Sequence, residues 1–158
     1  MPMRGVVEYV GSPEATAKEL RAAVKAELLK VIELWHEKML PQHFRTSAKT
    51  VYRYQERGEK YQRDKLKDVG HNRPLEYSGD MKHMVSRQIR PTATAKGARG
   101  RMKGPHYLYA YRKNFKQPDK ADEMTRTTRH EVLTLARSLD RGTTHRLNNV
   151  KTKETKTI

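Results

Sequence analysis

The sequence predicts an α+β fold with a long helix near each end of the chain and a small β-hairpin between them. In two segments near the ends of the 158 residues, apolar side chains recur at three- and four-residue steps, which is typical of amphipathic helices. Between these segments, a stretch of β-rich composition is interrupted by a Lys-Gly pair, which indicates two strands joined by a turn. A long basic loop or arm is expected between the first helix and the hairpin.

Residues 1–11 are expected to form an N-terminal arm or a short strand ahead of one domain at residues 12–149. Residues 6–10 are rich in valine and lie between two glycines, a pattern that bounds short strands. Residues 150–158 carry lysines and threonines with little to bury, so this tail is predicted to be disordered.

The first long helix has clear start and stop signals. Ser12 is placed to be its N-cap, Pro13 suits the first helical position, and Glu14 lies near the positive end of the helix dipole. Pro41 should end the helix near Met39, because the residue before a proline disfavours the α conformation. The apolar stripe consists of Leu20, Val24, Leu28, Val31, Ile32, Trp35 and Met39.

Residues 42–73 are polar and crowded with arginine, lysine and tyrosine. They show no clean apolar period, so a long exposed loop or arm is predicted, with helical turns in it as an open alternative. After them, Ser78 or Asp80 is placed to cap a short helix whose apolar side consists of Met81, Met84 and Val85.

The hairpin is predicted from two strands, residues 88–95 and 98–103, with Lys96-Gly97 as the turn. Pro91 lacks a backbone N–H, which favours an edge position or a bulge for the first strand.

The second long helix should begin at Asp119 as N-cap, with Asp122 and Glu123 in the first turn, where negative charge is favoured. Gly142 is expected to end it. Its predicted buried face consists of Met124, Thr128, Val132, Leu135 and Leu139, with Leu133 and Ala136 beside it.

The composition predicts a thin core. Only 35% of the residues are hydrophobic and the mean hydropathy is −1.00, so neighbouring copies are expected to complete the burial, and we expect an oligomer. The absence of cysteine excludes disulfides and cysteine-ligated metals. No apolar run reaches the ~20 residues of a membrane helix, and the N-terminus lacks a signal-peptide layout, so a soluble protein is expected.

The charge is strongly positive and unevenly spread. The chain has 34 Lys and Arg against 18 Asp and Glu, and residues 41–118 hold 19 of the basic but only 6 of the acidic residues. Such a field attracts polyanions: DNA, RNA, an anionic membrane or an acidic protein.

The sequence gives no support for an enzyme. The seven histidines include His36-Glu37 and His130-Glu131, but neither pair continues into the spacing of a metalloprotease. Residues 97–100 are glycine-rich but lack the Gly-Lys-Ser/Thr ending of a phosphate loop. We therefore predict no catalytic residues, no metal and no cofactor, and an unrecognised nuclease or toxin stays as the third hypothesis.

The basic middle interleaves cations with aromatic residues. Cations neutralise phosphates, whereas tyrosines stack on bases or anchor protein interfaces, and we prefer the interface interpretation for the tyrosines. The candidates for contact with nucleic acid are Arg45, Lys49, Arg53, Arg57, Lys60, Arg63, Arg99, Arg101 and Lys103. The candidates for a protein interface are Phe44, Tyr52, Tyr54, Tyr61, Tyr107 and Tyr109.

The order of segments resembles a known family. A long helix is followed by His43-Phe44, a Tyr/Arg-rich stretch, Pro74-Leu75, residues 77–81 (Tyr-Ser-Gly-Asp-Met), a hairpin and a helix that opens at Asp119. Over residues 14–139 this order resembles the tail-completion or neck proteins of tailed phages, which include virion-morphogenesis and minor tail protein Z-like proteins. Asp80 departs from the family pattern, which has a hydrophobic residue at or near this position.

The resemblance implies helices packed on a small antiparallel sheet and no catalytic residues. It further implies a homo-oligomeric ring, commonly hexameric, between the head connector or adaptor and the tail terminator or tail tube. Such a ring is assembled in the host cytoplasm, becomes part of the virion and surrounds the channel for genomic DNA, which the basic residues would line. The alternative function is a sequence-independent nucleic-acid-binding module.

Overall fold

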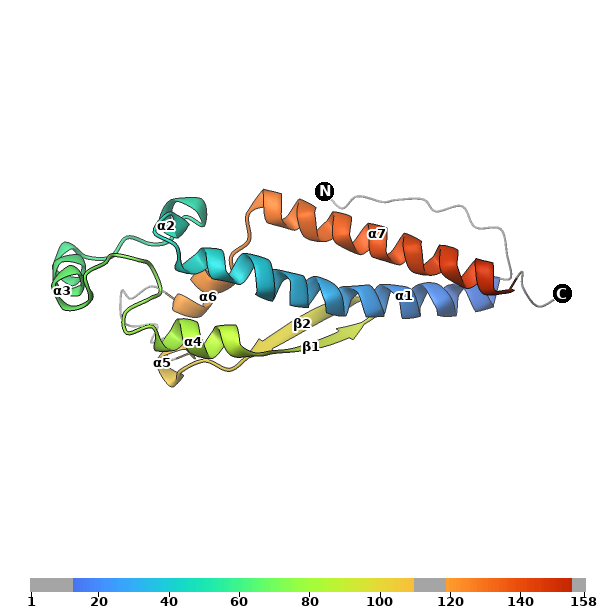
Figure 1. Ribbon diagram of the computed structural model, residues 1–158, viewed down its shortest axis with the longest axis horizontal. Coiled ribbons are helices and arrows are strands. Elements are labelled where there is room, and N and C mark those ends of the chain that lie inside the picture. Colours follow the sequence, from blue (N-terminus) through green and yellow to red (C-terminus); the bar gives the residue numbers. More distant parts are fainter. Residues whose placement is uncertain (1–12, 110–118, 155–158) are drawn as a thin grey trace.

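The computed structural model describes residues 13–109 and 119–154, and these form an elongated arm with a lobe at one end (Figure 1). The arm consists of α1 (Pro13–Leu34), the hairpin strands β1 (Ile89–Thr94) and β2 (Gly97–Met102), and α7 (Arg129–Glu154). The lobe contains the short helices α2 (Ala48–Val51), α3 (Glu59–Val69), α4 (Asp80–Arg87), α5 (His106–Tyr109) and α6 (Lys120–Thr125). The predicted α+β class, with long helices and a small antiparallel sheet, is confirmed. The predicted arm or strand at residues 1–11 lies outside the described residues.

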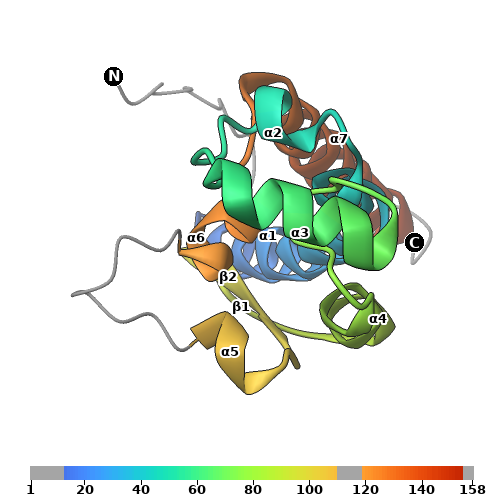
Figure 2. The ribbon, with the colours of Figure 1, turned by 90° about the vertical axis from the view of Figure 1, so that its left-hand side faces the viewer.

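The arm is built in three layers with α1 in the middle. The hairpin lies along one side of α1 and α7 along the opposite side, in both views (Figures 1 and 2). The helix starts at Pro13, as predicted. Side chains of its apolar stripe, such as Val24, Leu28 and Ile32, are only half-buried, because they are shared between two thin layers. No helix in the described ranges is long and apolar enough to cross a membrane.

The chain does not stop being helical at Met39. A π-helical turn, η1 (Trp35–Met39), leads directly into a 3-10 helix, η2 (Leu40–Phe44). Pro41 lies in the first turn of η2, where its missing N–H is not needed. His36 in η1 donates from Nε2 to the carbonyl of Val85 at 2.7 Å and so fastens α4 to this end of α1.

The hairpin forms where it was predicted, although its turn is Ala95-Lys96 and Gly97 already opens β2. Ile89 pairs with Met102 and Pro91 with Gly100, and this face lies against α1. A Cβ at Gly100 would collide with Ile89 and would come within 2.9 Å of Ile32. The glycine therefore allows the strand to approach the helix closely.

The prediction that residues 42–73 form a long exposed loop is wrong. The segment contains η2, α2 and α3, and α3 ends at Gly70, which adopts a left-handed conformation with φ +71°. Phe44, Ala48, Tyr52 and Tyr54 are buried in the core of the lobe. These residues share their core with side chains from distant segments, such as Leu108 and Met124. Among the described residues, the core cluster consists of Leu40, Phe44, Ala48, Tyr52, Tyr54, Leu75, Met81, Val85, Leu108 and Met124.

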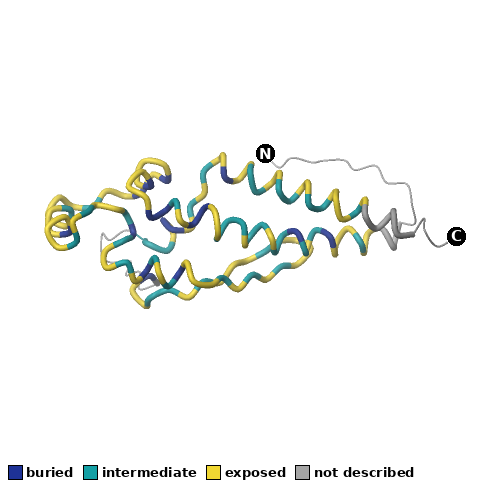
Figure 3. Tube along the Cα trace, viewed as in Figure 1, coloured by how far each residue is buried: buried dark blue, intermediate teal, exposed yellow. Residues whose placement is uncertain are grey.

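Burial differs sharply between the two parts of the molecule, as Figure 3 shows. Among the described side chains of α1, the hairpin and α7, only Ala23, Glu27 and Glu131 are buried. The large buried side chains lie instead in the lobe. The arm therefore carries very little core of its own.

The second helix of the prediction is in fact two helices. Asp119 caps α6 as expected, because its Oδ1 accepts hydrogen bonds from the backbone N–H of Ala121 and of Asp122, each at 3.0 Å. The chain then becomes extended at Arg126, and a new cap starts α7. Glu131 Oε2 accepts from the Thr128 N–H at 2.8 Å, while Thr128 Oγ1 accepts from the Glu131 N–H at 3.2 Å, which is a capping box.

Because α7 is a separate helix that begins at Arg129, its buried side differs from the predicted one. Met124 belongs to α6 and is buried in the lobe, whereas Val132 and Leu133 are 50% and 41% exposed. Leu135 and Leu139 are half-buried, in line with the prediction. The helix runs through to Glu154, so residues 150–154 are helical, and residues 155–158 of the predicted tail lie outside the described residues.

Gly142 has a packing role and does not end the helix. The buried carboxylate of Glu27 on α1 lies over it, where a Cβ would collide with the carboxyl group. Glu27 pairs with Lys30 at 2.9 Å and with Arg146 of α7. Burial raises the pKa of Glu27, but the hydrogen bonds and charges of Arg146 and Lys30 outweigh burial and hold that pKa below its ordinary value.

Glu131→Ala should lower the free energy of unfolding by about 2–4 kcal/mol, because it removes a cap and leaves the buried Tyr52 hydroxyl without its acceptor. Chemical denaturation followed by circular dichroism measures this change. Glu33→Ala, at an exposed position of α1, is the matched control and should change stability by less than about 0.5 kcal/mol. Equal stabilities for the two variants would contradict this role of Glu131.

Candidate functional site

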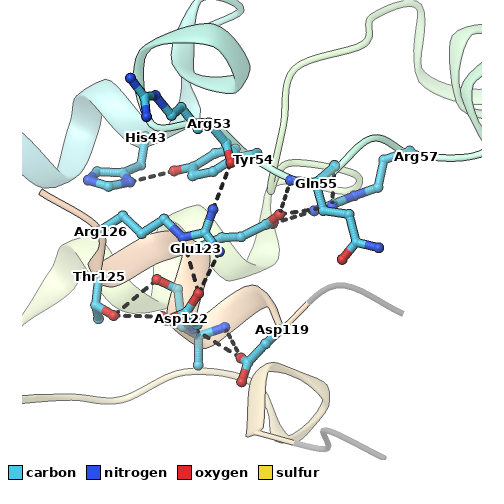
Figure 4. Close-up of polar contacts among 11 residues, drawn as sticks. His43, Arg53, Tyr54, Gln55, Arg57, Asp119, Asp122, Glu123, Thr125 and Arg126 are labelled. Carbon is cyan, nitrogen blue, oxygen red and sulfur yellow. Dashed lines mark hydrogen bonds and ion pairs between the residues drawn. The ribbon is translucent and has the colours of Figure 1, made fainter. Parts of the chain in front are cut away.

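One arginine of the basic middle of the chain, Arg57, forms an ion pair with a buried carboxylate, Glu123. The Arg57 guanidinium donates from NH2 to Glu123 Oε2 at 2.5 Å and from NH1 to Oε1 at 3.0 Å (Figure 4). The backbone N–H of Gln55 donates to the same Oε1 at 2.9 Å, and Glu123 is only 1% exposed. Arg57 is therefore engaged by a buried carboxylate, which does not fit its predicted role as a free contact for nucleic acid.

Two tyrosines and a histidine continue this network. The His43 ring stacks on Tyr52 with centroids 3.8 Å apart, and its Nδ1 hydrogen bonds with the Tyr54 hydroxyl at 2.5 Å. The Tyr52 hydroxyl donates to Glu131 Oε1 at 2.6 Å. Burial raises the pKa of both tyrosines, and it lowers the pKa of His43 to about 4 against the opposing effects of the Glu131 charge and the Glu123 backbone. These side chains are consequently neutral at physiological pH.

Arg53 lies at the edge of the same network in a left-handed conformation, with φ +53°. Its carbonyl accepts from Arg126 NH1 at 2.7 Å, and Arg126 is held in turn by Asp122 Oδ2 at 2.7 Å (Figure 4). These contacts hold a backbone conformation that is unfavourable for a residue other than glycine. The Arg53 side chain itself is exposed.

The predicted interface residues separate into two groups. Phe44, Tyr52 and Tyr54 are buried within the chain itself, so in this conformation they are not available to another protein. Tyr61 and Tyr107 are exposed, at 43% and 41%. Tyr109 is the last residue of α5, and its side chain lies outside the described part.

The structure does not gather the nine predicted cationic contacts on one surface. The residues on the lobe are exposed except Arg57, and Lys49 is paired with Glu56 at 2.6 Å. Lys49 lies on α2, and Lys60 and Arg63 lie on α3; both helices are at the end of the molecule away from the hairpin turn (Figure 1). The members of this lobe group are Arg45, Lys49, Arg53, Arg57, Lys60 and Arg63, and Arg99, Arg101 and Lys103 belong to the hairpin region.

The hairpin presents an outer face of arginines, which we call the arginine face: Arg90, Arg99 and Arg101. The strand register places Arg90 directly opposite Arg101, and Arg99 opposite Thr92, all on the side away from α1. The three arginines are exposed, and no ion pair joins them to a carboxylate in the described ranges. They border a hollow of about 600 Å³ that also reaches Met124 of α6.

Arg90 is not among the predicted contact residues. The predicted Lys96-Gly97 turn would pair Arg90 with Lys103, whereas the observed turn at Ala95-Lys96 places it opposite Arg101. Like charges directly opposite each other on a sheet destabilise it, so the arrangement is unfavourable without an anion. Arginines and threonines on an exposed strand face suit phosphate groups.

Among residues 13–109 and 119–154, no group of three or more His, Asp or Glu side chains could hold a metal ion. No family model, curated protein or solved structure matches this chain.

Stability should fall as the pH falls from 6.5 to 4, because His43 is neutral in the fold and gains a proton in the unfolded chain first. The shift from the ordinary value to about 4 corresponds to about 3 kcal/mol of unfolding free energy. Denaturant titrations at pH 7 and pH 4 should show a smaller loss for His43→Gln than for the unchanged protein. The exposed His83→Gln should keep the full loss, and an equal loss in all three proteins would refute the assignment.

Proposed function

We propose that this chain is a structural protein of the head–tail junction of a tailed bacteriophage. In this proposal it forms a neck or tail-completion ring that joins the head connector to the tail and surrounds the DNA channel. The segment order over residues 14–139 resembles that family, and the observation that carries the proposal is the nearly coreless arm.

A free arm of this kind lacks the burial that normally stabilises helices in water. Its three layers bury only Ala23, Glu27 and Glu131 among the described side chains, and two of these are acids. Val132 and Leu133 remain exposed on α7, and Leu20 on α1. Neighbouring copies that pack along the arm would cover these apolar side chains and supply the missing core.

The arginine face supports the second half of the proposal. In a ring, each copy would contribute three arginines. Together they would attract the phosphate backbone of DNA whatever its sequence. DNA that must pass through is served better by exposed, sequence-blind charges than by contacts to base edges. The partners would be the head connector or adaptor proteins on one side and the tail terminator or tail tube on the other, within the virion.

A second candidate function is a sequence-independent nucleic-acid-binding module, favoured by the same arginine face. The two functions differ in what the chain does alone. The module binds DNA tightly as a single copy, whereas the ring protein assembles first and holds DNA weakly.

The purified chain should form a closed ring of about six copies at high concentration, as measured by native mass spectrometry and electron microscopy. Val132→Glu with Leu133→Glu should shift it to monomers, because burying a carboxylate in a neighbour's apolar contact is costly. Leu66→Glu, at an equally exposed apolar position on α3 in the lobe, is the control and should leave the ring intact. A chain that stays monomeric at every concentration would argue against the ring.

Changing Arg90, Arg99 and Arg101 together to Gln should reduce the slope of log affinity against log salt by roughly 3, since each phosphate contact contributes about 0.9. Fluorescence anisotropy with two labelled DNA duplexes of unrelated sequence measures it, and both should respond alike. The control changes Lys18, Arg21 and Lys25 of α1 to Gln, which removes the same charge from exposed positions outside the predicted contact residues. Nanomolar binding by a monomer at physiological salt would favour the module over the ring.

A further inference from the structure

A second cationic site lies in the lobe. It is a pocket of about 350 Å³ bordered by α3, the segment that leads into α4, α5 and α6. Figure 2 looks onto this end of the molecule, with α3 in front, α6 beside it, and α4 and α5 below it. Arg57, Lys65 and Lys120 converge on the pocket, and its apolar lining includes Leu75 and Met81.

The acids near the pocket are already engaged. Glu123 is paired with Arg57 at 2.5 Å. Glu76, which lines the pocket, lies 3.4 Å from Arg73 and 3.5 Å from Lys82. Both carboxylates are therefore neutralised by groups other than the two lysines of the pocket.

Lys65 and Lys120 have aromatic and carbonyl partners in place of a carboxylate. Lys65 Nζ donates to the backbone carbonyl of Arg73 and lies 5.9 Å from the centroid of the Tyr61 ring. Lys120 Nζ lies 5.1 Å from the centroid of the Tyr107 ring. Within the described residues, neither ammonium group is within ion-pair distance of a carboxylate.

The positive charges of Arg57, Lys65 and Lys120 repel one another at this pocket. Burial lowers the pKa of Lys65 and of Lys120, and the nearby Arg57 charge lowers both further. Glu76 opposes this effect at Lys65 and Glu123 opposes it at Lys120, but the pKa of each lysine stays below its ordinary value. An anion between the two ammonium groups would relieve the repulsion.

We propose that this pocket binds one carboxylate from an acidic peptide segment of a partner protein, held between Lys65 and Lys120, with an adjacent apolar side chain on Leu75 and Met81. Tyrosines and an arginine around an apolar floor are the composition of protein-binding hot spots. The site goes beyond the proposed ring and does not depend on it.

Nucleic acid fits the pocket less well than a peptide does. Tyr77 lines the pocket, and its hydroxyl donates to Asp68 at 2.5 Å, a hydrogen bond that raises the pKa of Tyr77 to about 12. The Asp68 carboxylate would repel a run of phosphates, whereas a single carboxylate needs only the one position between the lysines. The chain's own residues 110–118 contain three cations and no acid, so they do not supply the anion.

The test titrates the full chain with N-acetyl-glutamyl-leucine amide and with its glutaminyl counterpart, and follows tyrosine and lysine side-chain signals by NMR. The glutamyl dipeptide should bind at least tenfold more tightly than the glutaminyl one, since a hydrogen bond to a charged group is the stronger kind. Lys120→Gln should remove this preference, while Lys96→Gln, which deletes an equal charge at the hairpin turn, should leave it unchanged.

Equal binding of the two dipeptides, or a preference that survives Lys120→Gln, would overturn the site. A labelled oligothymidylate added as competitor covers the other class of ligand: displacement of the dipeptide by it, lost in Lys120→Gln, would replace the peptide assignment. The mass of the assembled chain is measured separately, so a failed pocket and a failed ring are distinguished.

Discussion

The lobe depends on two buried carboxylates, Glu123 and Glu131. A carboxylate that leaves water is tolerated only where hydrogen bonds or opposite charges replace its hydration. Arg57 and Gln55 provide them for Glu123, and Tyr52 does so for Glu131, the last across 79 residues of sequence. These hydrogen bonds join the basic middle of the chain to α6 and to the start of α7, and the core of the lobe lies around them.

This arrangement divides the positive charge of the protein into three kinds. Arg57 neutralises an internal acid and belongs to the fold. The arginines of the hairpin are free on a surface, where they meet polyanions without selecting among them. Lys65 and Lys120 are confined in a pocket, where geometry rather than charge alone decides what fits. A net charge of +16 therefore does not translate into one uniform basic surface.

Elements held by local interactions were predictable from the sequence, and those held by distant ones were not. The helix starts at Pro13 and Asp119 and the hairpin turn depend on interactions between residues close in sequence. The two helix starts were predicted correctly, and the turn was predicted one residue away from its observed position. Tyr52 looked like a surface anchor because its acid, Glu131, lies far along the chain. The Thr128–Glu131 capping box was visible in the sequence and would have revealed the break between α6 and α7. Of the predicted contact residues, Arg99 and Arg101 remain on an accessible face, and Arg90 joins them only when the strands are paired.

The polar contact between α1 and α7, in which Glu27 lies over Gly142 and pairs with Arg146, fixes how the two helices are aligned. Leucine side chains alone would let two helices slide past each other by a turn at little cost, since one apolar contact resembles the next. Glu27, seated over Gly142 and bonded to Arg146, fits at one height only. The two helices are therefore held in one register, which fixes how far α7 extends along α1.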